Sequence, residues 1–350
     1  MLSLRQLSGI RSRKFTLKFL VGHYGSGKST VGRLMCEEEV AKNGRKKVIY
    51  VCFSNNSNGE ELKGQFQADF RNSSNAEVKL YARAECCTNY NVIDSDDNVA
   101  VIEQIVLALD EDSVIMFDEA PMSSKGKGKR QSFDWTELKN NRQDVTVIVS
   151  LQPVVQEETI LSRPHHVKYP GQADVVELTQ QYRSSTRIIR LINSMCREDL
   201  PIQYSSLEAV PRHEVEGPEV MVYHVTEAIS GLALKALRHC LTSGLQKLKC
   251  SIGKLKIICD RETKATALEL FGDTEYAACI RTLSQLQGCE TPIAVVIFPQ
   301  DDNFSRLVEM CSRAQYKLYI VIINHPKLVK HLDPEMVTFA AKEEINAFGM

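Results

Sequence analysis

The sequence predicts an α/β protein of two domains, each built on a parallel β-sheet with helices on both faces. Three observations support this fold class. The chain has 350 residues, about twice the length of a typical domain. Short apolar runs alternate with segments of helical periodicity in both halves, which is the pattern of successive strand–helix–strand units. Several of these runs are apolar almost throughout, which is typical of parallel strands covered on both faces.

The first domain is expected to span 1–165. Its opening strand runs into a glycine-rich turn, and the helix that follows stops before Gly44. Residues 54–80 are polar and define no clear element. The expected elements, in chain order, are a strand at 15–21, a helix at 28–43, a strand at 47–53, a helix at 98–109, and strands at 113–117 and 145–151.

A linker is expected at 161–172, where Pro164, Pro170 and Gly171 interrupt regular structure. The second domain is then expected to span 173–350, with the same alternation of strands and helices. Its expected strands lie at 220–225, 255–260, 294–298 and 317–323, and its expected helices lie at 184–196, 228–243, 262–271 and 303–314.

The composition is that of a folded globular protein. Hydrophobic residues make up 43% of the chain and charged residues 25%, which excludes a disordered, collagen-like or simple coiled-coil chain. No apolar run approaches the roughly 18 residues of a membrane-spanning helix, so no membrane partner is expected. The formal net charge is -1, so any contact with nucleic acid must come from a local basic patch.

The eleven cysteines are scattered without paired C-x-x-C spacing. This pattern favours reduced thiols over zinc ligands or disulfides, and therefore a cytoplasmic or nuclear location. The first 36 residues carry seven basic residues and no acidic one, so a mitochondrial presequence is an alternative to a solvated basic N-terminus.

The segment GHYGSGKS at 22–29 matches the phosphate-binding pattern G-x-x-x-x-G-K-[ST] and stands between an expected strand and an expected helix. Its glycines allow backbone amides to surround phosphate oxygens, and the helix N-terminus adds positive potential. Lys28 is expected to reach the β- and γ-phosphates and Ser29 to bind Mg²⁺, which makes ATP with Mg²⁺ the expected cofactor. The alternative is a glycine-rich turn with an incidental lysine. The residues expected to hold the nucleotide here are Gly22, Gly25, Gly27, Lys28, Ser29 and Thr30.

Two acids end the strand expected at 113–117. An aspartate in this position, Asp118, can hold Mg²⁺ through water, and Glu119 can orient or deprotonate the attacking water. A solvated acidic strand end is the alternative.

Segments across both domains resemble the motifs of superfamily 1 helicases of the UvrD/Rep type. LTQQYRSS at 178–185 is similar to motif IV, TLSQLQGCE at 282–290 to motif V, and MCSRA at 310–314 to motif VI. In the first domain, Phe53-Ser54-Asn55 is similar to motif Ia and Asp118-Glu119-Ala120 to motif II. The resemblance covers residues 15–325 in the order of the family.

The resemblance implies two RecA-like P-loop NTPase domains with the nucleotide in the cleft between them. Tyr182 would stack on the base, and Arg183 and Arg313 would reach the γ-phosphate. Gln152 would sense that phosphate after a first-domain strand, and Gly288 and Glu290 of motif V would lie at the nucleotide. The alternatives are a core aromatic at Tyr182, a surface salt bridge or helix-face charge at each of the two arginines, and a role for Gln152 unconnected with phosphate.

Several positions depart from the family pattern. Motif III lacks its Gly-Asp, Pro121 replaces the glutamine of motif II, and Gln285 and Gln287 replace the histidine and lysine of motif V. The intervals 55–118 and 183–282 leave little room for the accessory domains of UvrD-type enzymes. The compact helicase-like domains of Schlafen proteins are comparable in this respect. An adenine-reading glutamine in the family would correspond to Gln6.

Candidate nucleic-acid surfaces are few. Phe53 could stack on a base of a single strand, or could be a buried residue at a strand end. A basic loop follows the expected Mg²⁺ site and could contact phosphates, serve as a nuclear address or be a solvated loop. Its basic residues are Lys125, Lys127, Lys129 and Arg130.

Three functions are compatible with these features. The first is an ATP-hydrolysing helicase or translocase core acting on single-stranded DNA or RNA. The second is a nucleotide-gated regulatory or immune-type module that signals to a protein partner without unwinding. The third is a one-domain kinase, or another phosphate-transfer enzyme, with an unrelated C-terminal half.

Overall fold

The chain divides into two compact units, and the crossing from the first to the second falls between Gln181 and Tyr182. Each unit has its own sheet and helices, and each is described by itself. The computed structural model describes residues 17–22, 25–43, 45–53, 63–64, 66–68, 70, 76–94, 98–120, 142, 145–151, 174–178, 180–199, 210–211, 215–225, 231–249, 251–286, 289–298, 304–323, 329 and 332–340.

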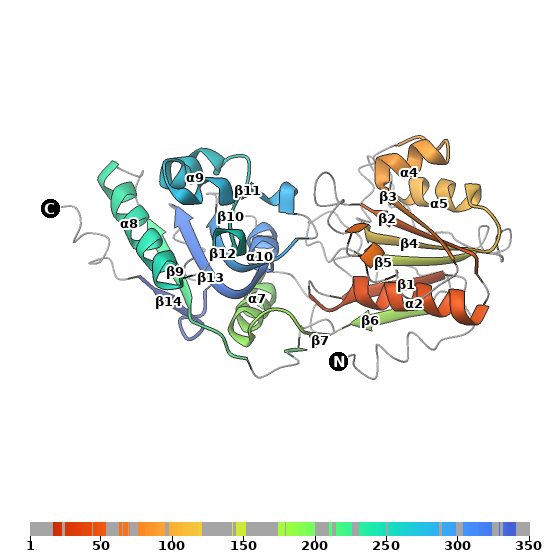
Figure 1. Cartoon of the computed structure of the whole chain (residues 1–350). Helices are drawn as coiled ribbons and strands as arrows, with labels where there is room; N and C mark the ends of the chain where they lie inside the picture. The colour runs from red at the N-terminus through yellow and green to blue at the C-terminus, as the bar shows by residue number, and fades with distance from the viewer. Residues whose placement is uncertain are drawn as a thin grey trace. The chain divides into compact units, whose positions relative to one another are not determined.

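A parallel sheet forms the centre of the first unit (Figure 1). Among the described residues its strand order is β3-β2-β4-β5-β1-β6, and every pairing is parallel. The unit also contains the two-residue β7, Gln180–Gln181. The strands of the sheet are β1 (Leu17–Gly22), β2 (Lys47–Cys52), β3 (Glu77–Ala82), β4 (Ser113–Ala120), β5 (Thr146–Leu151) and β6 (Asp174–Leu178).

Helices cover both faces of this sheet. The helix α2 (Lys28–Asn43) packs on one face, while α4 (Arg83–Asn89) and α5 (Asn98–Ala108) lie on the other (Figure 1). Gly32 allows α2 to approach β4 closely, because a methyl group there would lie 2.4 Å from the terminal carbon of Met116. The core on the α2 side includes Leu20, Val31, Met35, Val48, Tyr50, Cys52, Met116 and Ile148.

The second unit repeats this plan. Its described strands form a parallel sheet in the order β11-β10-β12-β13-β9-β14. Short 3₁₀ helices lie at Ile252–Lys254, Glu275–Cys279 and Leu283–Leu286, and the two-residue β8 at Val210–Pro211. The strands of the sheet are β9 (Val220–Val225), β10 (Leu255–Cys259), β11 (Ile280–Thr282), β12 (Thr291–Phe298), β13 (Ala314–Ile323) and β14 (Val337–Phe339).

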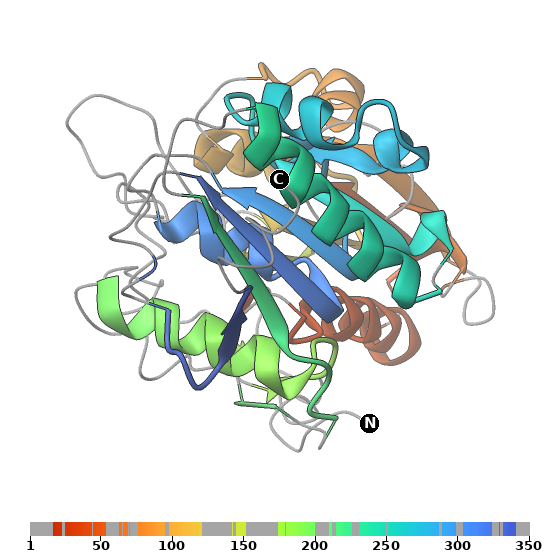
Figure 2. The ribbon, with the colours of Figure 1, turned by 90° about the vertical axis from the view of Figure 1, so that its left-hand side faces the viewer.

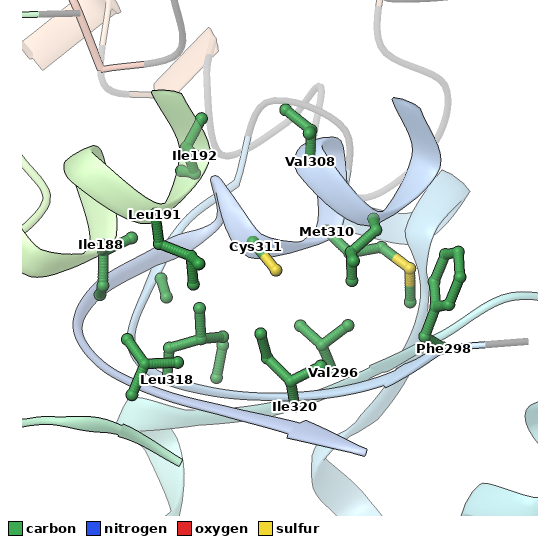
Figure 3. Close-up of a cluster of buried hydrophobic side chains, with 14 of the residues drawn as sticks. Ile188, Leu191, Ile192, Val296, Phe298, Val308, Met310, Cys311, Leu318 and Ile320 are labelled. Carbon is green, nitrogen blue, oxygen red and sulfur yellow. The ribbon is translucent and has the colours of Figure 1, made fainter. Parts of the chain in front are cut away.

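Successive side chains along these strands pack into two separate hydrophobic cores, one on each face of the sheet. The helices α7 (Thr186–Asp199) and α10 (Phe304–Cys311) cover one face, and α8 (Gly231–Lys247) and α9 (Lys264–Phe271) cover the other. Figure 2 shows α7 and α8 on opposite sides of the sheet. On β13, for example, Leu318 and Ile320 belong to the first core, and Tyr319 and Val321 to the second, as the two-residue period of a strand requires. Figure 3 shows Leu191 of α7 and Cys311 of α10 pointing toward the strand residues of the first core.

The structure confirms the α/β class of two parallel sheets flanked by helices. It corrects the start of the second domain, which we expected at 173. Asp174–Leu178 instead pairs with β1 as an edge strand of the first sheet, and the second unit begins at Tyr182. The expected linker at 161–172 lies outside the described residues.

Within the described part of the chain, no helix combines the length and apolar character needed to cross a membrane.

Candidate functional site

The segment 22–29 lies where the fold brings a strand end and a helix start together. Gly22 ends β1 at the carboxyl edge of the sheet, and Lys28 begins α2. Gly25 and Gly27 have φ angles of 73° and 86°, in the left-handed region that favours glycine. A methyl group on Gly22 would lie 2.4 Å from the carbonyl oxygen of Leu178 on β6. These three glycines are therefore required by the path of the loop and by its close contact with β6.

Lys28 is folded back onto the loop. Its ammonium group donates a hydrogen bond to the Gly22 carbonyl at 2.9 Å, and the residue is 7% exposed. Ser29 is partly buried and Thr30 is exposed in the first turn of the 16-residue α2, which carries no acidic residue in that turn. The N-terminal amides, the helix dipole and the lysine thus give this edge of the sheet positive potential.

Asp118 lies at the carboxyl end of β4, at the same sheet edge as the loop. Val114 and Met116 pack into the core on the α2 side, so the two-residue period of the strand assigns Asp118 to that face as well. The side chain is fully buried, and Oδ2 accepts a hydrogen bond of 2.8 Å from the Tyr50 hydroxyl. The carboxylate is thus held in one orientation on the face that carries the phosphate-type loop.

Tyr50 was not identified from the sequence, where it is one residue of an apolar strand. It is 2% exposed, and its ring stacks on Phe66 with centroids 4.4 Å apart. Burial, and secondarily the adjacent Asp118 carboxylate, raise the pKa of the Tyr50 hydroxyl well above its ordinary value. The hydroxyl therefore stays protonated and donates to Asp118. A tyrosine within an otherwise aliphatic buried strand was the available signal, because a buried hydroxyl needs a partner.

Glu119 occupies a strained backbone position. Its φ angle is 53°, and the pairing of β4 with β5 shifts register between Phe117 and Ala120. Its amide donates to Oδ1 of Asp118 at 3.1 Å. A regular strand would send Asp118 and Glu119 to opposite faces, and this bulge breaks the alternation directly after Asp118. Left-handed non-glycine residues are concentrated at functional sites, which supports a chemical role for Glu119.

A Mg²⁺ ion fits these groups only if the nucleotide supplies the remaining ligands. The described residues contain no cluster of three or more His, Cys, Asp or Glu side chains that could hold a metal alone. Mg²⁺ usually binds to one or two protein oxygens, with phosphates and waters completing its octahedron. The Ser29 hydroxyl and the Asp118 carboxylate lie at the same edge of the sheet and would be the protein oxygens of such an arrangement.

The second unit brings together three residues of the helicase-like motifs. Arg183 forms an ion pair with Glu290, whose other oxygen accepts from the Gln315 side chain at 3.2 Å. Arg313 is 2% exposed and pairs with Glu309 at 3.1 Å. Its carbonyl accepts from the amide of Thr291, next to Glu290, at 2.9 Å. Arg183, Glu290 and Arg313 thus gather at the amino ends of β12 and β13. Gln315 was missed, because no sequence pattern marks it.

Hydrogen bonds connect the two residues that follow Arg183 to β13. The Ser184 hydroxyl donates to the Ala314 carbonyl at 2.8 Å, and the Ser185 amide donates to the Gln315 carbonyl at 2.7 Å. The segment before α7 is therefore fixed to the segment that follows Arg313, although the two are far apart in sequence.

Two aromatic candidates differ in their surroundings. Tyr182 is partly buried, and its expected role of base stacking stays a prediction. Phe53 is 3% exposed, with Phe117 against its ring edge at 6.0 Å and the Arg83 guanidinium 5.6 Å from its ring centroid. The suggestion that Phe53 stacks on a nucleic-acid base is therefore wrong for this conformation, and the alternative of a buried strand-end residue holds.

Further candidates lie outside the described residues. They are Gln6, Gln152, Gly288 and the basic loop with Lys125, Lys127, Lys129 and Arg130. Their expected roles stay predictions.

Gln181, which was also missed, lies against the phosphate-type loop. The residue is 4% exposed, and a methyl group built on Gly25 would lie 2.6 Å from its Nε2 atom. It follows the edge strand β6, which we had expected to belong to the second domain, so its position beside the loop could not be inferred.

Comparisons with known proteins find structural likeness without sequence likeness. No family model matches the chain, and no curated protein matches it. Similar solved structures include the PRRSV helicase, with a TM-score of 0.42 and 11% identity, over 94% of this chain and 56% of that one. They also include Arterivirus nonstructural protein 10 (helicase), with a TM-score of 0.43 and 13% identity, over 94% of this chain and 64% of that one. A complex of an Arterivirus nonstructural protein 10 (helicase) with DNA gives 0.41 and 13%, over 98% and 65%. The chain therefore spans 56 to 65% of the length of these structures.

Proposed function

We propose that this protein binds Mg²⁺·ATP at residues 22–30 and hydrolyses it, as the core of a superfamily 1-type helicase or translocase that acts on single-stranded DNA or RNA. One observation carries the proposal. The GHYGSGKS loop, with Gly25 and Gly27 in left-handed conformations, lies at the same sheet edge as a buried aspartate and a strained glutamate. Phosphate-binding loops, a metal-holding aspartate and a water-positioning acid are the parts that phosphoryl transfer to water needs.

Each group has a defined part in this proposal. Backbone amides of 25–29 hold the phosphates, and Lys28 exchanges the Gly22 carbonyl for a phosphate oxygen. Ser29 and Asp118 hold Mg²⁺, which neutralises charge on the phosphates when it is bound. Glu119 accepts the proton of the attacking water, or orients that water, from the bulge that separates it from the regular strand.

Arg183 and Arg313 are proposed to stabilise the charge that develops on the transferred phosphate. Arginines in this role contribute about 10³–10⁵ in rate where they have been measured. Each is held by a carboxylate, Arg183 by Glu290 and Arg313 by Glu309. Both ion pairs restrict the orientation of the guanidinium groups.

The proposal is tested by the rate of ATP hydrolysis with and without single-stranded DNA and RNA oligonucleotides, at two salt concentrations. We expect nucleic acid to raise the rate, and the stimulation to fall at the higher salt because contacts to the phosphate backbone release counterions. Lys28→Ala and Glu119→Gln should abolish turnover. Arg183→Ala and Arg313→Ala should reduce it while leaving ATP binding in place. A rate that no nucleic acid changes would contradict the motor function.

One observation favours a second candidate, a nucleotide-gated module that signals to a protein partner. Gln285 stands where the family has a histidine, and its side-chain oxygen accepts a hydrogen bond from the Thr282 amide at 2.9 Å. The side-chain oxygen of this exposed residue is thus used within its own turn. Equal capture of a partner by the ATP-bound and ADP-bound protein would contradict such a switch.

A further inference from the structure

Gln181 is a buried polar residue that lies against the phosphate-binding loop without belonging to it. The edge strand β6 runs beside β1 as far as the pair Leu178 and Gly22. The chain then continues past the sheet edge for three residues and places Gln181 with only 4% of its surface exposed. The strand pairing thus delivers this glutamine to the loop that begins at Gly22.

The contact with the loop is made through Gly25. A methyl group on that residue would lie 2.6 Å from Nε2, 2.9 Å from Cδ and 3.2 Å from Oε1 of Gln181. Distances below 3.0 Å are too short for a real methyl group, so the carboxamide occupies the space that any side chain at position 25 would need. The φ angle of 73° favours glycine at position 25, and a larger side chain there would also have to displace the carboxamide of Gln181.

A glutamine carboxamide is suited to support this loop, a role that we call a brace. A carboxamide offers two donor hydrogens and an acceptor oxygen without a net charge, so it can lie beside a phosphate-binding loop without repelling its ligand. The loop needs such support because its backbone amides must keep one geometry to bind phosphate. Gln181 is also the last residue of the first unit before the chain enters the second, where Tyr182 and Arg183 follow.

We propose that Gln181 is a positioning residue that holds Gly25, and with it the phosphate-binding loop, in the conformation that binds the nucleotide. The proposal rests on the proposed function only for the identity of the ligand, because the contact between Gln181 and Gly25 lies within the protein itself.

Hydrogen exchange in the ligand-free protein tests the brace directly. In Gln181→Ala, the amides of 25–29 should exchange roughly tenfold faster than in the unmodified protein, because local opening of the loop becomes easier. The matched control is Gln180→Ala, one residue earlier and partly exposed. Equal exchange of these amides in the unmodified protein and in Gln181→Ala would overturn the proposal, whatever the nucleotide result.

Nucleotide affinity supplies the second readout, with a fluorescent ATP analogue as the probe. Gln181→Ala should weaken binding by about tenfold with little change in melting temperature. Gln181→Glu keeps the shape but adds a negative charge, so its loss of affinity should diminish as salt is raised. If the unmodified chain binds no ATP, the proposed function fails, while the exchange experiment still decides the role of Gln181. Equal affinity in the unmodified protein and in Gln181→Ala would overturn the brace.

A double-mutant cycle tests the contact itself. Gly25→Ala should weaken binding, and part of that loss should disappear in the Gly25→Ala/Gln181→Ala protein, because the shorter side chain frees the space. Gly22→Ala is the control, since its clash is with the backbone oxygen of Leu178, which a change at Gln181 does not remove. Additive losses for the Gly25 pair would contradict the contact.

Discussion

Asp118 and Glu119 are neighbours in sequence, but the backbone places their side chains in different ways. Asp118 follows the regular alternation of β4 and is fixed by Tyr50, whereas Glu119 departs from that alternation at a left-handed position. The motif residues were predictable from their spacing, because the pattern G-x-x-x-x-G-K-[ST] and the two acids at a strand end are local features. Tyr50 and Gln181 were not, because their roles depend on neighbours that only the folded chain brings close.

Replacing Glu119 by glycine separates its chemistry from its backbone strain. A left-handed non-glycine residue costs about 1–2 kcal/mol, so we expect Glu119→Gly to raise the free energy of unfolding by about 1 kcal/mol while ATP hydrolysis is lost. Glu119→Gln is the matched control, because it removes the charge and retains the strain. Urea denaturation measures both, and equal stability of the two variants would contradict the strain at this position.

The Tyr50 hydroxyl can be removed without changing the shape of the core. Tyr50→Phe takes away the donor to Oδ2 of the buried Asp118, and a hydrogen bond to a charged group contributes about 1.5–3 kcal/mol. We expect a loss of stability of that size, measured by urea denaturation in the presence of EDTA. Tyr81→Phe, on the partly exposed edge strand β3, serves as the control and should change little. Equal effects of the two substitutions would show that the hydroxyl does not hold Asp118.

The sequence predicted the central strands of the two large sheets better than the strands at their edges. The central strands β1, β2, β4, β5, β9, β10, β12 and β13 were all expected, because burial on both faces makes them apolar nearly throughout. In the two six-stranded sheets the described edge strands were missed, namely β3, β6, β11 and β14, as was the two-stranded sheet of β7 and β8. Edge strands are less buried and carry polar residues, as β3 does with Glu77 and Lys79 on one face, so their pattern resembles that of a loop. Missing β6 also displaced the domain boundary and concealed Gln181.

The start of α4 supplies a pH-dependent test at this scale. The Glu85 carboxylate accepts from the Ala82 amide at 2.7 Å and from the Lys63 ammonium at 3.1 Å, and these hydrogen bonds, the amide first, lower its pKa. A carboxyl group whose pKa is lowered by folding stabilises the folded protein fully at a pH above the pKa of the unfolded state. This contribution declines below that pH and is lost as the pH falls through the lower pKa of the folded state. Glu85→Gln should therefore lower the urea midpoint at pH 7, and by less near pH 4. A difference that does not depend on pH would contradict the charge-assisted cap.

At the scale of the whole molecule, two similar α/β units carry different sets of functional groups. The first unit presents the phosphate-type loop with Asp118 and Glu119 at the carboxyl ends of its strands. The second gathers Arg183, Glu290 and Arg313 at the amino ends of β12 and β13. This distribution of motif residues between the two units could be predicted from the order of the motifs along the chain. The contacts that hold these side chains could not be predicted in the same way, since Glu309 and Gln315 belong to no motif.

The most direct measurement of the central claim is an equilibrium titration of the full chain with Mg²⁺·ATP, repeated with EDTA and with two lysine variants of α2. Lys28→Ala should weaken binding roughly 10- to 100-fold, as expected for the loss of a charge-assisted hydrogen bond to phosphate. Lys42→Ala, at the exposed end of the same helix, should bind like the unmodified protein. Removal of Mg²⁺ should weaken binding in the unmodified protein as well. Absence of binding by the unmodified chain, or equal affinity in the Lys28 and Lys42 variants, would contradict a nucleotide site at residues 22–30.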